Sequence, residues 1–246
     1  LNYVANKKNI KTIEIQHGPQ SEVHLGYASW SKLPENGFNT LPKSFWSWDN
    51  YSYNEINKWA NNDIQHNSFI GGNPWVDFLK SNNNVEKTIV LYSLQNLNFD
   101  HLFPDYIIKQ IKLTKDYDWW LRLHPRQTEY IDELIAFFKT KGIDHLVNIK
   151  EATELPLPEI LNRTKIHITN FSGCTLESVY YEVPTIIIDE RGFDAFKDIV
   201  MEKKAFYIAT SSEFTEIFNK LIIGNITITN DLQTITFKDI MKNLTI

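Results

Sequence analysis

Short apolar runs alternate with amphipathic segments along most of the chain, and this alternation predicts its elements. Apolar or alternating runs are typical of strands, whereas apolar residues spaced three and four apart are typical of helices. The runs predict strands at residues 10–16, 44–48, 68–72, 88–93, 119–123, 146–149, 166–169, 185–189 and 205–208. After the end of a helix at 1–8, the helical spacing predicts helices at 53–61, 76–80, 104–114, 128–141, 158–163, 174–182, 193–202 and 212–221.

This order of elements predicts the α/β fold class. Strands that alternate with helices form parallel sheets that are covered on both faces. The segment from about residue 85 to 225 is regular enough to predict a sheet of roughly five or six parallel strands. Residues 81–84 are polar and lack apolar anchors, so they are predicted to link a unit over 1–80 to a unit over 85–246.

Composition narrows the function classes. With one cysteine, Cys174, the chain can form neither an internal disulfide framework nor a cysteine-rich zinc module, and a reducing cytoplasm is expected. The net charge of -5 argues against nucleic-acid binding. No apolar stretch approaches the roughly 18–20 residues that span a bilayer. The aromatic residues Trp46 and Trp48 are predicted to fill core rather than to stack on sugars.

Histidine and arginine follow one predicted strand, in the run Leu123-His124-Pro125-Arg126. Ligands of open parallel sheets bind beyond the carboxyl ends of the strands, so residues at these positions are site candidates. His124 can donate a hydrogen bond to a phosphate oxygen, and Arg126 adds a charge-assisted donor. The equal alternative is a histidine that bonds only to nearby backbone.

A serine and a glycine lie between another predicted strand and the helix that follows it. Free N–H groups in the first turn of that helix would attract a phosphate, and Gly173 would let the backbone approach it. Ser172 and Thr175 add hydroxyls, and Glu177 can accept both hydroxyls of a ribose. The same residues also fit a structural interpretation, with a serine cap and a glutamate that suits the helix dipole.

The first predicted strand ends in Gln16-His17-Gly18, before a long loop rich in Pro, Gly and Asn. Long loops inside compact domains are often functional. His17 is therefore predicted to be a base for an acceptor hydroxyl or a phosphate contact, with a structural His-Gly turn as the alternative. His24 and Glu22 in this loop are secondary candidates. The dispersed histidines predict no metal site, and the phosphate-binding glycine loops and the serine-hydrolase elbow are absent.

Four short motifs spread over roughly residues 10–210 resemble those of the GT-B superfamily. They are Gln16-His17-Gly18, Gly71-Gly72-Asn73-Pro74, Leu123-His124-Pro125 and Ser172-Gly173-Cys174-Thr175-Leu176-Glu177. Similar members are bacterial surface-polysaccharide transferases that use CMP-sialic acid or CMP-Kdo, the CDP-glycerol transferases and the non-hydrolysing UDP-GlcNAc 2-epimerases.

The resemblance implies two Rossmann-like domains that face a cleft. Residues 1–80 would be the C-terminal part of the N-terminal, acceptor-side domain, and 85–246 the nucleotide-sugar-binding domain. The implied roles are phosphate binding for His124, Ser172, Gly173 and Thr175, ribose binding for Glu177, and a cleft-facing position for His17. Since the first domain would be short, the sequence is expected to be a fragment, with the usual catalytic acid upstream, or a degenerate relative.

The sequence thus predicts a metal-independent, inverting glycosyltransferase without a cofactor. It would move a sugar from a CMP- or UDP-sugar donor to a glycan or lipid-linked acceptor of a surface polysaccharide or lipopolysaccharide. Two alternatives stay open, a sugar-nucleotide 2-epimerase and a non-catalytic nucleotide-sugar-binding module of a polysaccharide-synthesis complex. The expected location is the cytoplasm, with or without peripheral attachment to the inner membrane.

Overall fold

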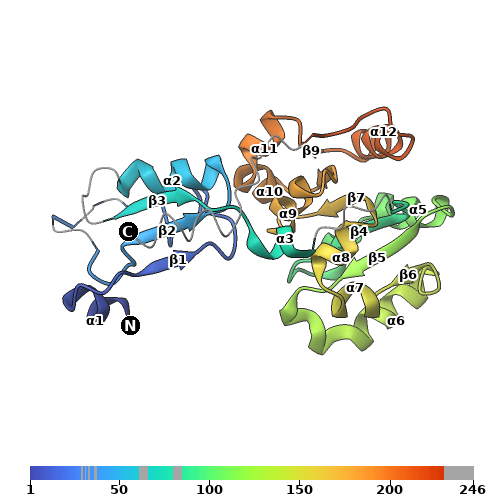
Figure 1. Ribbon diagram of the computed structural model, residues 1–246. Helices are drawn as coiled ribbons and strands as arrows, with labels where there is room; N and C mark the ends of the chain where they lie inside the picture. The colour runs from blue at the N-terminus through green and yellow to red at the C-terminus, as the bar shows by residue number, and fades with distance from the viewer. Residues whose placement is uncertain are drawn as a thin grey trace. The chain divides into compact units, whose positions relative to one another are not determined.

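Two compact units make up the chain, and each is built on a parallel sheet (Figure 1). The computed structural model describes residues 1–28, 30, 32, 34, 35, 38–60, 66–79 and 85–229. The first unit contains Leu1–Phe78, and the second begins at Leu79. The linker predicted at 81–84 lies outside the described residues. In the described part of the chain, no helix combines the length and the apolar character needed to cross a bilayer.

The first unit has a three-stranded sheet of order β1-β2-β3 with every pair parallel. Its elements are α1 (Asn2–Lys7), β1 (Ile13–Ile15), β2 (Ser44–Ser47), α2 (Asn50–Ala60), β3 (Asn67–Ile70) and α3 (Pro74–Leu79). Phe45 of β2 packs with Ile56 and Trp59 of α2 in the core of this unit. The strand predicted over 10–16 is therefore shorter than expected, because only Ile13–Ile15 pairs with β2.

Trp46 connects β2 to the turn after β3. Its side chain is 2% exposed and that of Trp48 is 9% exposed, which confirms that both fill core. The indole N–H of Trp46 donates to the carbonyl oxygen of Gly72 at 2.9 Å. A Cβ atom on Gly71 would lie 2.0 Å from the indole nitrogen of Trp46, so only glycine fits at this position.

The second unit has a six-stranded parallel sheet of order β6-β5-β4-β7-β8-β9. Counted from its own first strand, this is the 3-2-1-4-5-6 order of dinucleotide-binding Rossmann sheets. The prediction of a sheet of five or six parallel strands between about residues 85 and 225 is confirmed. The strands are β4 (Ile89–Ser93), β5 (Asp118–Arg122), β6 (Val147–Asn148), β7 (Thr164–Thr169), β8 (Thr185–Ile187) and β9 (Ala205–Tyr207).

Helices cover both faces of this sheet (Figure 1). Trp119 and Leu121 of β5 join a core cluster with α5, α6 and α12, whereas Arg122, on the other face, bonds to α7. The helices are α4 (Phe99–Leu102), α5 (Asp105–Leu113), η1 (the 3-10 helix Pro125–Tyr130), α6 (Ile131–Lys141), α7 (Lys150–Glu154), α8 (Leu157–Leu161), α9 (Cys174–Tyr180), α10 (Glu190–Ala195), α11 (Lys197–Met201) and α12 (Ser211–Ile222).

Two predicted helices differ from the structure. The helix expected over 128–141 begins earlier, as η1, because His124 caps that 3-10 turn and Pro125 suits its first position. The helix expected over 193–202 is two helices, α10 and α11, because Phe196 between them has a non-helical φ of -124°. The short helices α4 and α7 were not predicted, since their few residues give no clear helical period.

We expect Gly71→Ala to destabilise the first unit. The added Cβ would meet the Trp46 ring, which is fixed by its bond to Gly72. Overpacking of this kind typically costs about 1–3 kcal/mol. Chemical denaturation followed by tryptophan fluorescence measures the change. Gly18→Ala is the matched control, because its Cβ would have no neighbour within 4 Å. Equal stability of the two variants would contradict the packing argument.

Candidate functional site

The carboxyl ends of β4, β5 and β7 meet at one edge of the sheet in the second unit. β4 pairs with β5 on one side and with β7 on the other, and all three run parallel. The strand order reverses between β4 and β7, and such reversal points are where open α/β sheets bind ligands. The segments that follow these three strands hold all the site residues predicted for this unit.

The turn between β7 and α9 is tied to the end of β4. The N–H of Ser172 donates to the hydroxyl of Thr169 at 3.0 Å, and that hydroxyl donates to the carbonyl oxygen of Ser93 at 3.1 Å. The hydroxyl of Ser172 accepts from the N–H of Cys174 at 3.3 Å. The N-cap of α9 is Gly173 and not Ser172, so the serine cap of the alternative interpretation is not formed, although Ser172 bonds to the first residue of the helix.

The first turn of α9 is less open than predicted. The N–H of Thr175 donates to the carbonyl oxygen of Ser172, and the N–H of Leu176 to that of Gly173. These internal bonds correct the expectation of a row of free donors. The N–H of Gly173 has no hydrogen-bond partner among the described residues. The hydroxyl of Thr175 is buried and also unpartnered, but it is out of reach of solvent.

Glu177 lies in the first turn of α9, within electrostatic reach of the guanidinium of Arg122. Burial raises the pKa of Glu177 to about 7, and the positive charge of Arg122 opposes this rise. Arg122 itself donates to the carbonyl oxygens of Ala152 and Leu155, both at 2.8 Å. The guanidinium thus holds the end of α7 against the end of β5, with a titratable carboxyl close by.

His124 caps the 3-10 helix η1 at the end of β5. Its ring nitrogen Nδ1 accepts a hydrogen bond from the N–H of Arg126 at 3.2 Å, and its backbone N–H donates to the side chain of Gln127 at 3.0 Å. Because Nδ1 accepts, the neutral ring carries its proton on Nε2, which is the donor that an anion needs. The side chain is partly exposed and that of Arg126 is exposed. The backbone contact predicted as the alternative for His124 is therefore present at Nδ1, and the phosphate contact stays a prediction for Nε2.

The predicted phosphate residues fall into two groups. Ser172, Gly173 and Thr175 share the turn after β7, whereas His124 and Arg126 follow β5, and β4 lies between the two strands. Two strand spacings separate β5 from β7, or about 9–10 Å. Both groups therefore follow strands that end at one edge of the sheet, with β4 between them.

His17 lies in the first unit, just after β1. Its side chain is exposed, and its ring centroid is 6.5 Å from that of Tyr27. Tyr27 also contacts the ring of His24 at 4.9 Å and donates its hydroxyl to Glu14. Burial, and then the Glu14 carboxylate, raise the pKa of Tyr27 well above its usual value. A cleft that His17 shares with the second unit remains a prediction.

Gln16, the residue before His17, fixes the turn that follows β1. Its side-chain amide nitrogen donates to the hydroxyl of Ser52 at 3.0 Å and to the carbonyl oxygen of Gly18 at 2.9 Å. Its side-chain oxygen accepts from the N–H of Trp48 at 2.7 Å. The side chain of one buried glutamine therefore holds the chain on both sides of His17 in place.

Sequence reasoning missed several polar residues at this edge of the second unit. Ser93 is the last residue of β4 and Arg122 the last residue of β5. Their positions at the ends of predicted strands could have identified them as site candidates. After β8, Asp189 makes a two-bond ion pair with Arg191, at 2.7 and 2.9 Å, and the guanidinium lies 4.3 Å from the ring of Phe171. The hydrogen bond from Arg191 lowers the pKa of Asp189.

The prediction of a metal-independent site rests partly on the absence of the Asp-x-Asp motif of metal-dependent glycosyltransferases, and this ground is wrong, because Asp116-Tyr117-Asp118 has that spacing. Asp118 is the first residue of β5 and both aspartates are exposed. The pair therefore lies at the amino end of the strand, opposite the edge that holds His124. We assign it no part in the candidate site.

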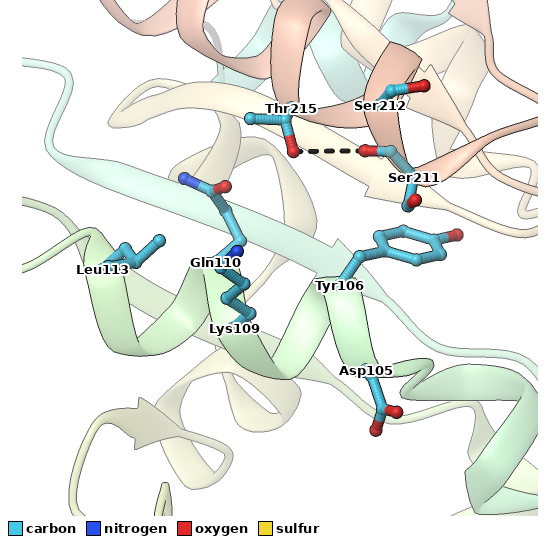
Figure 2. A pocket seen from close by; sticks show the side chains of 8 residues that line it. All are labelled: Asp105, Tyr106, Lys109, Gln110, Leu113, Ser211, Ser212 and Thr215. Carbon is cyan, nitrogen blue, oxygen red and sulfur yellow. Dashed lines mark hydrogen bonds between the residues drawn. The ribbon is translucent and has the colours of Figure 1, made fainter.

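A cavity of about 540 Å³ lies between α5 and α12, on a helical layer of the second unit (Figure 2). Tyr106 and Lys109 line it from α5, and Ser211 and Thr215 line it from α12. The hydroxyl of Thr215 donates to the carbonyl oxygen of Ser211 at 3.1 Å. No predicted site residue lines this cavity, so its volume alone does not make it the site.

No protein-family model matches the sequence, and no curated protein matches it. Solved structures do match. A UDP-GlcNAc 2-epimerase from Methanocaldococcus jannaschii, in complex with UDP-GlcNAc and UDP, aligns with a TM-score of 0.63 and 18% identity, over 98% of this chain and 71% of the epimerase chain.

Two further structures have the same fold. MnaA of S. aureus, solved with UDP, aligns with a TM-score of 0.59 and 12% identity over 90% of this chain and 61% of its own. The wall teichoic acid polymerase TagF aligns with a TM-score of 0.52 and 13% identity over 88% of this chain and 60% of its own. At such identities the similarity establishes a Rossmann-like, GT-B-type α/β fold, as the sequence predicted.

Glu177→Gln tests whether burial keeps this carboxyl protonated. Its pKa is about 7 in the folded chain against an ordinary 4.5, so the folded state binds more protons between these values. The free energy of unfolding therefore falls as pH rises from about 4.5 to about 7. Glutamine cannot ionise, so the variant does not lose this part of the free energy of unfolding as pH rises. We expect Glu177→Gln to be more stable relative to wild type at pH 8 than at pH 5, measured by chemical denaturation.

Glu213→Gln is the control with the opposite sign. Backbone N–H groups of Ala209 and Thr210 lower the pKa of Glu213, so its contribution is present above the ordinary pKa and is lost only at lower pH. This variant should be destabilised by similar amounts at pH 5 and pH 8. A pH-independent effect of Glu177→Gln as well would contradict the raised pKa.

Proposed function

We propose that this chain is the nucleotide-sugar-binding part of a GT-B-type glycosyltransferase. It would move a sugar from a UDP-sugar, or alternatively a CMP-sugar, to a glycan or lipid-linked acceptor in the synthesis of a surface polysaccharide or lipopolysaccharide. The proposal includes no cofactor and no metal. Its principal support is the Nε2–H of His124, which follows β5, the strand beside the reversal between β4 and β7 in a 3-2-1-4-5-6 sheet.

The spacing of the two phosphate-binding groups favours a diphosphate donor. His124 and Arg126 would hold one phosphate from the end of β5, and the N–H of Gly173 would hold the other from the turn after β7. The two strands are separated by about 9–10 Å, which side chains and a diphosphate together can span. A single phosphate would reach one group only. UDP is also the nucleotide in two of the similar structures.

The proposed chemistry is a single displacement with inversion. His17, as a base in the first unit, would take the proton of the acceptor hydroxyl, whose oxygen then attacks the anomeric carbon. The bond from that carbon to the phosphate oxygen breaks, and the nucleotide leaves with the electron pair. Nε2–H of His124 and the charge of Arg126 would stabilise the negative charge that grows on the leaving phosphate.

Glu177 is proposed to accept the ribose hydroxyls of the nucleotide. An ionised carboxylate is the better acceptor for two hydroxyl donors. Since burial raises its pKa to about 7, nucleotide binding would draw a proton off this group and would strengthen between about pH 6 and pH 8. Arg122, which bonds to the end of α7, would favour that ionised form.

A sugar-nucleotide 2-epimerase is the second candidate. The observation that favours it is the similarity to the M. jannaschii epimerase over 98% of this chain. An epimerase and a glycosyltransferase differ in their need for an acceptor. Incubation with UDP-GlcNAc alone would change the sugar configuration if the chain were an epimerase, whereas a transferase would need an acceptor. A chain that binds nucleotide sugars and turns none over would be the non-catalytic module.

His124→Ala should weaken UDP binding by roughly ten- to a hundredfold, since a charge-assisted bond contributes about 1.5–3 kcal/mol. Calorimetry with UDP measures this change in affinity. The alanine also removes the cap of η1, at about 0.5–2 kcal/mol of stability.

His124→Asn separates binding from capping. Asparagine is a good cap and keeps an acceptor near the N–H of Arg126, but it lacks the Nε2–H donor. It should therefore retain the melting temperature and lose UDP affinity. If His124→Asn bound UDP as tightly as wild type, the histidine would be only a cap and the proposed phosphate contact would be wrong.

His17→Asn should lower the turnover of the donor by about 10²–10⁴-fold, the usual contribution of a general base. UDP affinity should not change, because the proposed phosphate contacts lie in the second unit. Release of UDP from a donor panel measures turnover, and calorimetry measures binding. His145→Asn, at a histidine whose side chain is 71% exposed on the second unit, is the matched control. Undiminished turnover in His17→Asn would remove this residue from the mechanism.

A further inference from the structure

A second cavity, of about 470 Å³, lies beside His124, between the segment after β4 and the helices η1 and α6. Gln127 connects the two features. Its side-chain oxygen accepts from the backbone N–H of His124, and its amide nitrogen donates to the carbonyl oxygen of Gln95 at 2.7 Å. The cavity is lined by residues that include Asn96, Asn98, Phe99, Gln127, Tyr130 and Glu133.

Four of these side chains have polar groups that are available to a ligand. Asn96, Asn98, Tyr130 and Glu133 make no side-chain hydrogen bond or ion pair with any described residue, and all four are exposed. Asn98 is at the N-cap of α4 yet makes no capping bond with its side chain. Amides and carboxylates present paired donors and acceptors that match neighbouring hydroxyl groups. This set suits a ligand rich in hydroxyls.

Two aromatic rings line the same cavity. Phe99 is held by Phe137, with ring centroids 5.5 Å apart, and Tyr130 is 47% exposed. Ligand sites typically combine such apolar surfaces with a few polar groups that fix the ligand's orientation. A pyranose ring has hydroxyls at its edge and C–H groups on its faces, so it matches both kinds of lining.

The charge of the lining restricts the sugar. Glu133 is a carboxylate, and none of the lining residues is Lys, Arg or His. A sugar with its own carboxylate would meet a like charge without a compensating cation, which disfavours binding. A neutral sugar meets no such repulsion, and its hydroxyls can donate to Glu133.

We propose that this cavity binds the sugar ring of the donor, that the ring is a neutral hexose or N-acetylhexosamine, and that Glu133 disfavours acidic sugars. This inference rests on the proposed function, because it places the sugar next to the phosphate that His124 would hold. It deepens that function by naming the class of sugar transferred.

The test uses the whole chain and three ligands, UDP, UDP-glucose and UDP-glucuronate. The two sugar nucleotides differ only in a carboxylate on the sugar. Calorimetry should show UDP-glucose binding at least about tenfold more tightly than UDP-glucuronate, a difference of about 1.4 kcal/mol. Glu133→Gln should reduce this preference to about threefold or less and leave UDP affinity unchanged. Glu129→Gln, at an exposed carboxylate of η1 outside the cavity lining, should keep the full preference.

Tyr130→Ala provides a second, independent test. It should weaken UDP-glucose binding several-fold and leave UDP binding unchanged, because UDP lacks the sugar. Equal loss for both ligands would show that the cavity holds the nucleotide, and this would overturn the inference. A preference that persists in Glu133→Gln, or equal affinity of wild type for both sugar nucleotides, would also overturn it.

The two proposals fail in different ways. If UDP binds and depends on His124 while the cavity variants change nothing, the inference is overturned and the proposed function stands. If no nucleotide or nucleotide sugar binds, the proposed function is overturned and the inference with it.

Discussion

The pairing of β4 with β7 places the turn that holds Ser172 and Gly173 beside the carboxyl end of β4. His167 of β7 is fully buried, and it bonds through Nε2 to the hydroxyl of Ser93 and through Nδ1 to the hydroxyl of Thr185, both at 3.0 Å. Burial lowers its pKa to about 3, so the ring is neutral and can donate at one nitrogen and accept at the other. One buried side chain thus connects β4, β7 and β8 just below the strand ends.

This constraint explains the form of the candidate site. Because β4 lies between β5 and β7, the turns that follow β5 and β7 are held apart. A ligand bound at the carboxyl end of β4 would be contacted by both turns. The turn after β7 is packed from outside as well. A Cβ on Gly192 of α10 would lie 2.0 Å from the carbonyl oxygen of Asn170, so α10 lies directly against that turn. The candidate site is therefore supported by packed elements, which would suit the diphosphate that we propose as its ligand.

Most of this fold was predictable from the sequence because the apolar period of strands and helices reflects local geometry. Strand order was not predictable, since it depends on contacts between distant residues. For the site, the sequence predicted that His124 and Ser172 follow strands. It could not predict that β4 separates these strands, because this depends on the strand order. The roles of Arg122 and the raised pKa of Glu177 depend on burial and on a neighbour from another strand, which no local pattern contains.

Hydrogen–deuterium exchange with and without UDP tests the central claim most directly, because it reports on every segment in one experiment. We predict that UDP slows exchange in the segments that follow β4, β5 and β7, at residues 93–95, 122–127 and 170–177. Exchange at the cavity between α5 and α12 should not change. Protection confined to that cavity, or no protection at saturating UDP, would contradict the account.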